Sequence, residues 1–485
     1  MKSNIAIIKT DKYQYPLGET FRPSQKYPEY IFKEDVTETE NHVYDMVRHG
    51  LYKMGFDEAN YGKESWNPLG GFVKTGDVVL IKPNLVMHKN MADLGTDCLY
   101  THPSVVAPVI DYVLKALNGS GEIIVGDAPM QECDFETLIS ESHYKDMIEY
   151  YQSRTNVAIS LCDFRDLRSE RKNGMNYSVV NEVSGGRIID LKSESEFAEK
   201  DEAYFEKIRI TNYDPSILKE HHNIDKHEYC VNEKVLVADV VINMPKPKTH
   251  RKAGVTIGLK NLVGINARKE YLPHHTNGSK KEGGDEYLNF LKLKNFKDFL
   301  LDKRNFFMQT KKNYKAAWVL QKTIGALNRV IKIVEKDDYY EGSWYGNDTI
   351  CRTIVDLNKI IFYADKEGVL ADQKMKKYLV VADMIISGEK EGPLLPSPKN
   401  VGIIAIGTNP VCFDEAIATI MGAKLEYIST ICRARNTKSK YKLVDDEMAF
   451  LISNDKRWNE KRIEDLTEED LIVFEPTSGW KEGFR

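Results

Sequence analysis

The run NMPKPKTHRKAGVTIGLKNLVG at positions 243–264 carries most of the side chains in this sequence that could do chemistry. A proline separates Lys246 from Lys248 and keeps the backbone extended, so we expect both ammonium groups to project the same way. Together with Lys260 they could hold a phosphate or carboxylate through charge-assisted hydrogen bonds. His250 could transfer a proton, since its ordinary pKa is about 6.5. The run predicts an anion site; the alternative interpretation is a solvated basic loop.

Other polar side chains follow short apolar runs elsewhere in the chain. Lys82 and Asn84 come after VVLI, Asp127 comes after IIV, and Asp383 lies near the end of YLVVADMII. Parallel sheets place their working residues just past the carboxyl ends of strands. We therefore expect these side chains to share one crevice with the lysines of the 243–264 run.

Three carboxylates near predicted strand ends, Asp127, Asp356 and Asp383, could gather on a divalent cation such as Mg²⁺. Carboxylates in such positions also cap helices, which is the alternative. The sequence has no phosphate-binding loop, no dinucleotide fingerprint and no nucleophile elbow. Its seven cysteines contain no Cys-x-x-Cys pair, which argues against a zinc knuckle and an iron–sulfur cluster.

The elements that must position these residues are short runs that are apolar on both faces. Continuous apolarity is typical of strands covered on both sides, and helix-like stretches at 104–118 and 411–422 follow two of them. We expect an α/β fold with a mainly parallel sheet and flanking helices. GDVVLIKPN and ADVVINMPK share a pattern, which would be explained if the fold consisted of two related lobes. The expected strands are 5–8, 78–81, 123–125, 235–242, 360–364, 378–386 and 401–406.

Charged residues are distributed unevenly along the chain. Residues 246–336 hold 21 basic and 7 acidic residues, a net charge of +14, which leaves −19 for the rest. Within this segment, 286–336 has apolar residues three and four apart with lysines between, so we expect a basic amphipathic helical insertion. It could be a solvated helix pair, a lid over an anionic substrate, or a helix resting on an anionic membrane. We expect the α/β region to comprise 1–285 and 337–430, and 431–485 to wrap around the outside.

The composition is that of an ordinary globular protein of enzyme size. Of 485 residues, 42% are hydrophobic and 29% charged, and the formal net charge of −5 gives no sign of a nucleic-acid partner. No stretch approaches eighteen apolar residues, and unpaired thiols fit a reducing compartment. We therefore expect a cytoplasmic protein.

Seven motifs, taken in order, resemble the family known as domain of unknown function 362. They are IKPNLV (81–86), THPSVV (101–106), VGDAP (125–129), VINMPKPKTHRKAGVTIGLKNLVG (241–264), GSWYGNDTICRTIVDLN (342–358), ADMIISGEKEGP (382–393) and GTNPVCFDEAIATIMG (407–422). The resemblance covers about residues 76–425 and implies an α/β fold with a shared site. Many relatives carry a ferredoxin-like module, but this chain has no such cysteine run. We therefore expect no iron–sulfur cluster. A divalent cation is the one cofactor that the residues suggest, and the sequence does not identify any other.

The residues and the resemblance together give one leading hypothesis, an enzyme acting on an anionic small molecule or polymer end that carries phosphate or carboxylate. The reaction stays undetermined. The alternative is a non-catalytic protein that docks on an anionic membrane or an acidic partner through the basic helices. The expected catalytic residues are His250, Asp127 and Asp383, and the expected substrate-binding residues are Lys82, Asn84, Lys246, Lys248, Lys260, Asn261 and Arg352.

Overall fold

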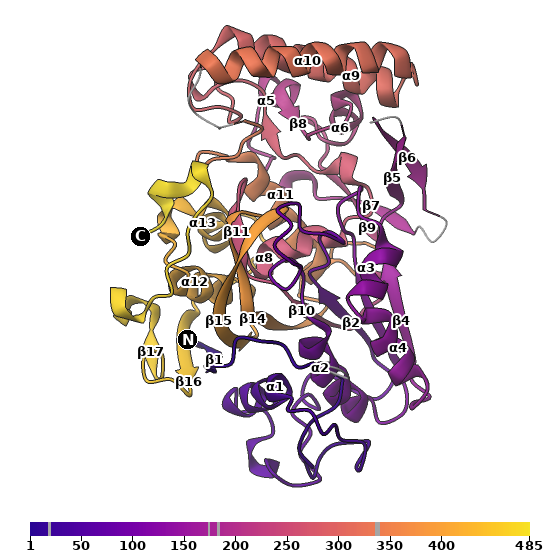
Figure 1. The fold of residues 1–485 in the computed structure, drawn as a ribbon, viewed down its shortest axis with the longest axis vertical. Helices are drawn as coiled ribbons and strands as arrows, with labels where there is room; N and C mark the ends of the chain where they lie inside the picture. The colour runs from indigo at the N-terminus through magenta and orange to yellow at the C-terminus, as the bar shows by residue number, and fades with distance from the viewer. Residues whose placement is uncertain (18–20, 173–174, 182–184, 335–339) are drawn as a thin grey trace.

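The apolar runs of the chain form a large mixed sheet in the computed structural model, which describes residues 1–17, 21–172, 175–181, 185–334 and 340–485. Eleven strands of the described residues belong to it (Figure 1). The main path runs β17 (Lys461–Arg462), β16 (Met448–Ser453), β1 (Lys2–Lys9), β15 (Leu395–Gly407), β14 (Lys377–Glu391), β10 (Val240–Met244), β2 (Val78–Pro83), β3 (Glu122–Asp127) and β4 (Ala158–Asp163). Two short strands, β11 (Lys248–His250) and β12 (Gly254–Thr256), attach beside β14.

Most neighbouring strands of the sheet are parallel, so the α/β prediction is confirmed. The run from β14 through β10, β2 and β3 to β4 is parallel throughout, and β1 and β16 are also parallel. β15 is antiparallel to both of its neighbours. Because β14, β10, β2 and β3 point the same way, the polar residues at their carboxyl ends lie near one edge of the sheet.

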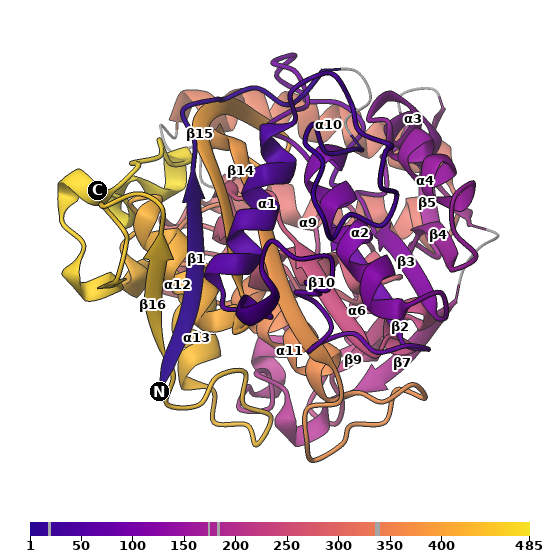
Figure 2. The same cartoon turned by 90° about the horizontal axis from the view of Figure 1, so that it is seen from below.

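Helices cover both faces of the sheet (Figure 2). In β2, Val79 and Ile81 face a core with α1 (His42–Lys53), α2 (Pro103–Leu117) and α4 (Tyr144–Gln152). Leu80 faces a second core with α11 (Thr349–Tyr363), α12 (Pro410–Ile420) and α13 (Ser429–Asn436). Burial on alternate sides explains why these strands are apolar at successive positions.

One predicted strand was only partly right and another was wrong. Of the predicted strand 235–242, residues 235–236 belong to a short helix, Glu233–Leu236, and β10 begins at Val240. Residues 360–364 belong largely to α11, every residue of which is buried. A helix that is buried all round is apolar at successive positions just as a buried strand is, so a short run cannot tell the two apart. Helices predicted at 104–118 and 411–422 are confirmed as α2 and α12.

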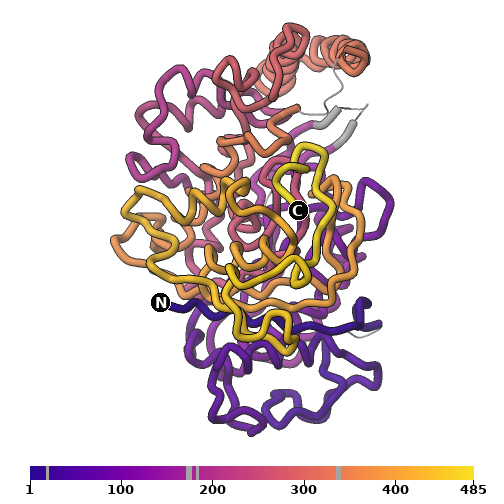
Figure 3. Tube along the Cα trace, turned by 90° about the vertical axis from the view of Figure 1, so that its left-hand side faces the viewer, coloured from indigo at the N-terminus to yellow at the C-terminus, as the bar shows by residue number. Residues whose placement is uncertain are grey.

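The middle of the chain builds a smaller region beside the sheet from short elements. Its strand pairs are β5 (Leu167–Lys172) with β6 (Met175–Val180), β7 (Gly186–Asp190) with β9 (Glu228–Asn232), and β8 (Ile208–Arg209) with β13 (His275–Thr276). Its helices include α5 (Glu202–Lys207), α6 (Pro215–His221) and α7 (Glu233–Leu236). Helix α3 (Phe135–Glu141) packs against α4, and α8 (Gly258–Asn261) lies against α12 and β10. Helices α9 (Lys292–Gln309) and α10 (Tyr314–Val334) lie side by side at one end of the molecule, seen end-on in Figure 3.

The C-terminal segment lies along one side of the molecule and also enters the sheet (Figure 3). Its strand β16 pairs with β1, so the two ends of the chain meet in the sheet. Trp458 and Trp480 are fully buried. The segment after residue 440 therefore contributes buried side chains to the core.

Candidate functional site

Two neighbouring parallel strands bring Lys82 and Asp127 together. Lys82 is the penultimate residue of β2 and Asp127 is the last residue of β3. Lys82 Nζ lies 2.7 Å from Asp127 Oδ1, and both side chains are buried. Asp127 also accepts the backbone N–H of Leu85 at 2.6 Å and of Ala128 at 2.9 Å. A buried charge pair costs free energy unless its remaining hydrogen-bonding positions also have partners, and these two backbone N–H groups are such partners. They also fix the position of the carboxylate.

An amide network joins this pair to Lys248. Asn261 Oδ1 accepts from Lys82 Nζ at 3.2 Å and from Asn84 Nδ2 at 2.9 Å, and Asn261 Nδ2 donates to Asn243 at 2.7 Å. Lys248 Nζ donates to Asn84 Oδ1 at 2.7 Å. These residues come from β2, β10, β11 and α8, so the sheet and the 243–264 run converge at one place.

Lys246 and Asp383 form a second buried pair close by, with Nζ and Oδ2 3.0 Å apart. The Tyr15 hydroxyl donates to Asp383 Oδ1 at 2.6 Å, and the backbone N–H of His102 donates to Asp383 Oδ2 at 2.9 Å. The Tyr15 and His102 rings are stacked with centroids 3.9 Å apart. The charge of Lys246 contributes to lowering the pKa of Lys248, so the two pairs share one electrostatic environment.

Gly264 lets the chain pass close over the first pair. A Cβ at this position would lie 1.8 Å from Asp127 Oδ1 and 2.7 Å from Lys82 Nζ. The backbone carbonyl of Gly264 accepts the N–H of Ala128 at 2.8 Å. The glycine is needed because the segment after α8 covers the ion pair directly.

His250 is held as a neutral imidazole. Its Nδ1 accepts the backbone N–H groups of Lys252 and Ala253, each at 3.1 Å. Burial, and then the positive charges of Lys260, Arg251 and Lys252, keep the pKa of His250 well below its usual value. Since Nδ1 accepts, the ring proton is on Nε2. His250 therefore offers an N–H donor to a ligand rather than a vacant basic nitrogen.

Lys260 differs from the other lysines of the site. It is partly exposed, and none of the described residues makes a hydrogen bond or ion pair with its ammonium group. Burial, and then the charge of Lys82, lower the pKa of Lys260 to about 8, while Asp127 opposes the shift. Burial and the charges of Lys246 and Lys260 lower the pKa of Lys248 to about 7.

Arg352 and Asp356 do not join these residues. Arg352 donates to Asp348 at 2.6 and 2.8 Å, and Asp356 accepts from Ser195 at 2.5 Å and lies 3.3 Å from Lys359 Nζ. These contacts hold α11 against the segment at 194–199. The expectation that Asp127, Asp356 and Asp383 share a cation is not supported, since the described residues contain no cluster of three His, Cys, Asp or Glu suited to a metal ion.

Sequence reasoning missed several residues at the site. Tyr15 reaches Asp383 from a segment 368 positions away, and no sequence pattern marks it. Lys269 donates to the carbonyl of Ala128 at 2.8 Å, and burial lowers its pKa to about 7 although Asp127 opposes this. Its position in the basic 246–336 segment was the only signal available.

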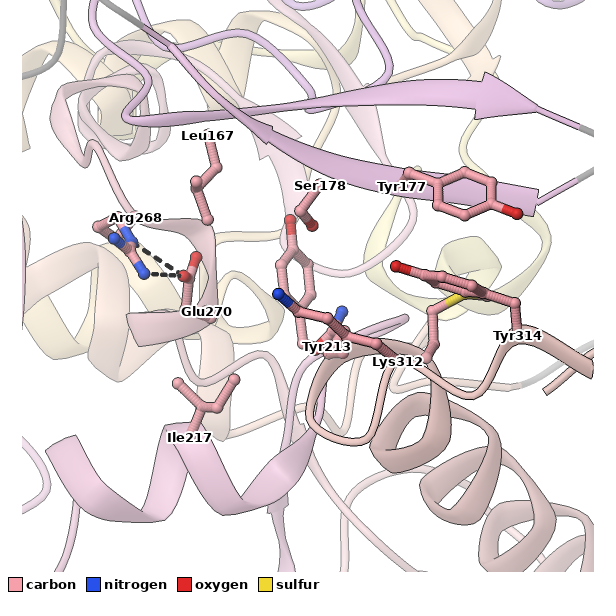
Figure 4. Close-up of a pocket in the computed structure, with 11 residues that line it drawn as sticks. Leu167, Tyr177, Ser178, Tyr213, Ile217, Arg268, Glu270, Lys312 and Tyr314 are labelled. Carbon is pink, nitrogen blue, oxygen red and sulfur yellow. Dashed lines mark hydrogen bonds and ion pairs between the residues drawn. The ribbon is translucent and has the colours of Figure 1, made fainter. Parts of the chain in front are cut away.

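A separate cavity of about 200 Å³ lies between the β5–β6 hairpin, α6 and the connection from α9 to α10 (Figure 4). Tyr177, Tyr213 and Tyr314 contribute to its wall, and the Arg268–Glu270 ion pair, with nitrogen and oxygen 2.7 Å apart, closes one side. None of the predicted site residues lines this cavity.

A family model described as a domain of unknown function, DUF362, matches residues 79–176 and 171–419. The chain belongs to this family. The DUF362 match contains β2, β3, β10 and the 243–264 run, and so contains Lys82, Asp127, Lys248 and Lys260. Tyr15 lies outside it.

The chain is also similar to a protein named thylakoid-associated protein sll1697, from Synechocystis sp., with 28% identity over 200 residues. The aligned part is 41% of this chain and 42% of that protein. The chain thus matches less than half the length of this relative.

Proposed function

We propose that this DUF362 protein is an enzyme that binds an anionic substrate, carrying phosphate or carboxylate, against Lys260 at the carboxyl ends of β2, β3 and β10. One observation carries the proposal: a partly exposed ammonium group without a described partner stands beside a buried, positively charged cluster. Lysines outnumber carboxylates in this cluster among the described residues. The lysines are Lys82, Lys246, Lys248, Lys260 and Lys269, and the carboxylates are Asp127, Asp383 and Asp97.

An anion would restore the charge balance. In the free protein, burial and then the charges of neighbouring lysines lower the pKa values of Lys248 and Lys260. A phosphate or carboxylate next to Lys260 would favour the charged lysines and gain strong hydrogen bonds from them. The buried ion pairs of Lys82 and Lys246 would act as a fixed support rather than as direct ligands.

The same groups supply proton transfer. A lysine with a pKa of about 8 exchanges its proton near neutral pH, which suits general acid–base chemistry. His250 would donate its Nε2–H to an oxygen of the substrate, stabilising negative charge as it develops. These roles are compatible with several reaction classes, so we name the substrate class and not the reaction.

The compartment we propose is the cytoplasm. All seven cysteines are free thiols, and six of them are buried. Free thiols persist in a reducing compartment. Among the described residues, no helix is both long and apolar enough to cross a membrane.

The test is calorimetric titration of the purified chain with inorganic phosphate, sulfate and citrate. Lys260→Met should weaken binding of the preferred anion about tenfold or more, because it removes a charged hydrogen-bond donor. Lys260→Arg should retain part of the affinity. Lys145→Met, at an exposed lysine on α4, is the matched control and should bind as the unmodified protein does. Equal binding by Lys260→Met and the unmodified protein, or no binding of any anion, would contradict the proposal.

A further inference from the structure

Helices α9 and α10 form an antiparallel hairpin along one end of the molecule (Figures 1 and 3). They contain 18 and 21 residues, so each is about 30 Å long. Both helices expose large apolar side chains, a feature that the anion site does not use or explain. We refer to residues 292–334 as the hairpin.

The first helix buries mostly polar side chains against the body of the protein, together with Leu300. Asp302 pairs with Arg209 at 3.0 Å, Asp298 accepts from the Tyr287 hydroxyl at 2.5 Å, and Asn305 donates to the carbonyl of Tyr213 at 2.9 Å. Lys294 and Lys297 are buried on the same side. An ordinary surface helix buries its apolar side instead.

The opposite side of α9 is aromatic and basic. Phe296 and Phe299 are 51% and 53% exposed, and Lys292 and Lys303 are exposed with them. Successive members of this set are four, three and four residues apart along the chain, so all four share one face of the helix. The Lys303 ammonium lies 5.6 Å from the centre of the Phe299 ring. This face therefore interleaves large apolar groups with positive charge.

The second helix also exposes a face of mixed apolar and basic residues. Its buried residues Ala317, Ile324 and Ile331 are seven apart and form a single seam. On the opposite face lies an exposed stripe of mixed apolar and basic character, with Trp318 48% and Ile333 83% exposed. The members of this stripe, which lie on one face of the helix, are Lys315, Trp318, Val319, Lys322, Ala326, Arg329, Val330 and Ile333.

All exposed charges of the hairpin are positive. The hairpin contains eleven Lys and Arg residues and two Asp residues, and eight of the basic residues are exposed. Neither aspartate is among the exposed residues; both make the body contacts described above. Two long cationic faces with protruding aromatic and aliphatic side chains have the composition of helices that lie in a membrane interface.

We propose that the hairpin docks this protein on an anionic lipid surface, with Phe296, Phe299, Trp318 and Ile333 entering the boundary between headgroups and acyl chains. Lysine stems can extend along the apolar region while their ammonium groups meet lipid phosphates. A lipid surface fits better than an acidic protein because the apolar residues are spread along the full length of both helices. Protein interfaces instead concentrate binding energy in a central cluster.

Trp318 provides a direct reporter for this proposal. The other four tryptophans, Trp66, Trp344, Trp458 and Trp480, are fully buried, so only the Trp318 indole is exposed to solvent. We expect its emission to shift to shorter wavelength when the full chain is mixed with vesicles of phosphatidylcholine containing about one third phosphatidylglycerol. Brominated lipid should quench this emission, and Trp318→Phe should remove both signals.

Sedimentation with the same vesicles tests the charge requirement. Lys315→Glu/Lys322→Glu/Arg329→Glu should lower the partition coefficient about tenfold or more, since each basic residue near an anionic surface contributes substantially to binding. Lys145→Glu/Lys456→Glu/Lys481→Glu makes the same charge change at exposed lysines elsewhere and should lower it much less. Circular dichroism checks that each variant keeps its helices.

The apolar requirement is tested by Phe296→Ser/Phe299→Ser. Its matched control is Ile188→Ser/Val369→Ser, two similarly exposed apolar residues away from the hairpin. Absence of vesicle binding by the unmodified chain would overturn the proposal. Equal loss of binding in a hairpin variant and its matched control would do the same. Binding of polyglutamate without binding of vesicles would also overturn it, in favour of an acidic protein partner.

Discussion

The lysines of the site are distinguished by their partners rather than by their sequence positions. Lys82 and Lys246 each face a carboxylate at 2.7 and 3.0 Å, whereas Lys260 has no such partner among the described residues. Burial lowers the pKa of Lys82 although the Asp127 carboxylate opposes the shift, and burial with neighbouring positive charges lowers the pKa of Lys248 to about 7 and that of Lys260 to about 8. Together with Lys269, whose pKa burial lowers to about 7, Lys248 and Lys260 are the residues whose protonation can respond to a ligand near neutral pH.

This difference predicts how anion binding depends on pH. Sulfate stays doubly charged across the neutral and mildly alkaline range, so any change in its binding reports on the protein. As pH rises through about 7 and 8, Lys248 and Lys260 lose the protons that an anion requires. We expect sulfate binding to weaken from pH 7 to pH 9, by up to about tenfold per pH unit above the pKa.

Titration calorimetry at several pH values measures this dependence. In Lys260→Met the same pH change should have a smaller effect, because one of the titrating groups is gone. Sulfate affinity that is constant between pH 7 and pH 9, or that increases with pH, would contradict the assignment of the titrating groups to these lysines.

The segment that follows α8 leaves very little space for a side chain at one of its positions. It passes over the Lys82–Asp127 pair at Gly264, where a Cβ would lie 1.8 Å from the carboxylate oxygen. Helix α10, in contrast, contains Gly325, where a Cβ would meet nothing within 4 Å. The same substitution should therefore have opposite effects in the two elements.

Gly264→Ala should lower the free energy of unfolding by about 1–3 kcal/mol or more, because the pair or the segment must move. Gly325→Ala should raise it by roughly 0.5–1 kcal/mol, since alanine favours an exposed helix more than glycine does. Urea denaturation followed by circular dichroism gives both values. If the two variants are equally stable, the close approach at Gly264 is not a real constraint.

In the whole molecule, the C-terminal segment is packed against the part of the chain that carries His250. The Trp480 indole donates to the carbonyl of Arg251 at 2.8 Å, and its ring lies against Gly254, where a Cβ would be only 2.6 Å away. β16 pairs with β1 in the central sheet. The end of the chain is thus connected both to the sheet and to the β11–β12 turn beside the site.

Trp480→Ala should therefore lower the free energy of unfolding by about 3–5 kcal/mol, as expected for a large buried aromatic residue. Trp318→Ala is the matched control at an exposed position and should change it by no more than about 0.5 kcal/mol. Chemical denaturation compares the two. A cost for Trp480→Ala as small as that of the control would show that the C-terminal segment is only loosely attached.

The sequence by itself determined the fold class and much of the sheet. Runs such as those of β2 and β3 are apolar at successive positions because side chains on both faces are buried, and that burial is recorded in the residues themselves. The rule that parallel strands end at one edge predicted that Lys82, Asn84 and Asp127 meet, and the basic 243–264 run together with the family resemblance added Lys248 and Asn261. The same apolar pattern does not distinguish a strand from a helix that is buried on all sides, as α11 is.

Only the tertiary structure decided which charges pair. Arg352 and Asp356 have the same residue types as members of the site, yet they bond with Asp348, Ser195 and Lys359 elsewhere. Tyr15 contacts Asp383 although its sequence neighbours give no indication of it. Local patterns record whether a side chain is buried, whereas the partner of a charge depends on distances between segments hundreds of residues apart. For that reason the unpartnered state of Lys260 could be recognised only in the folded chain.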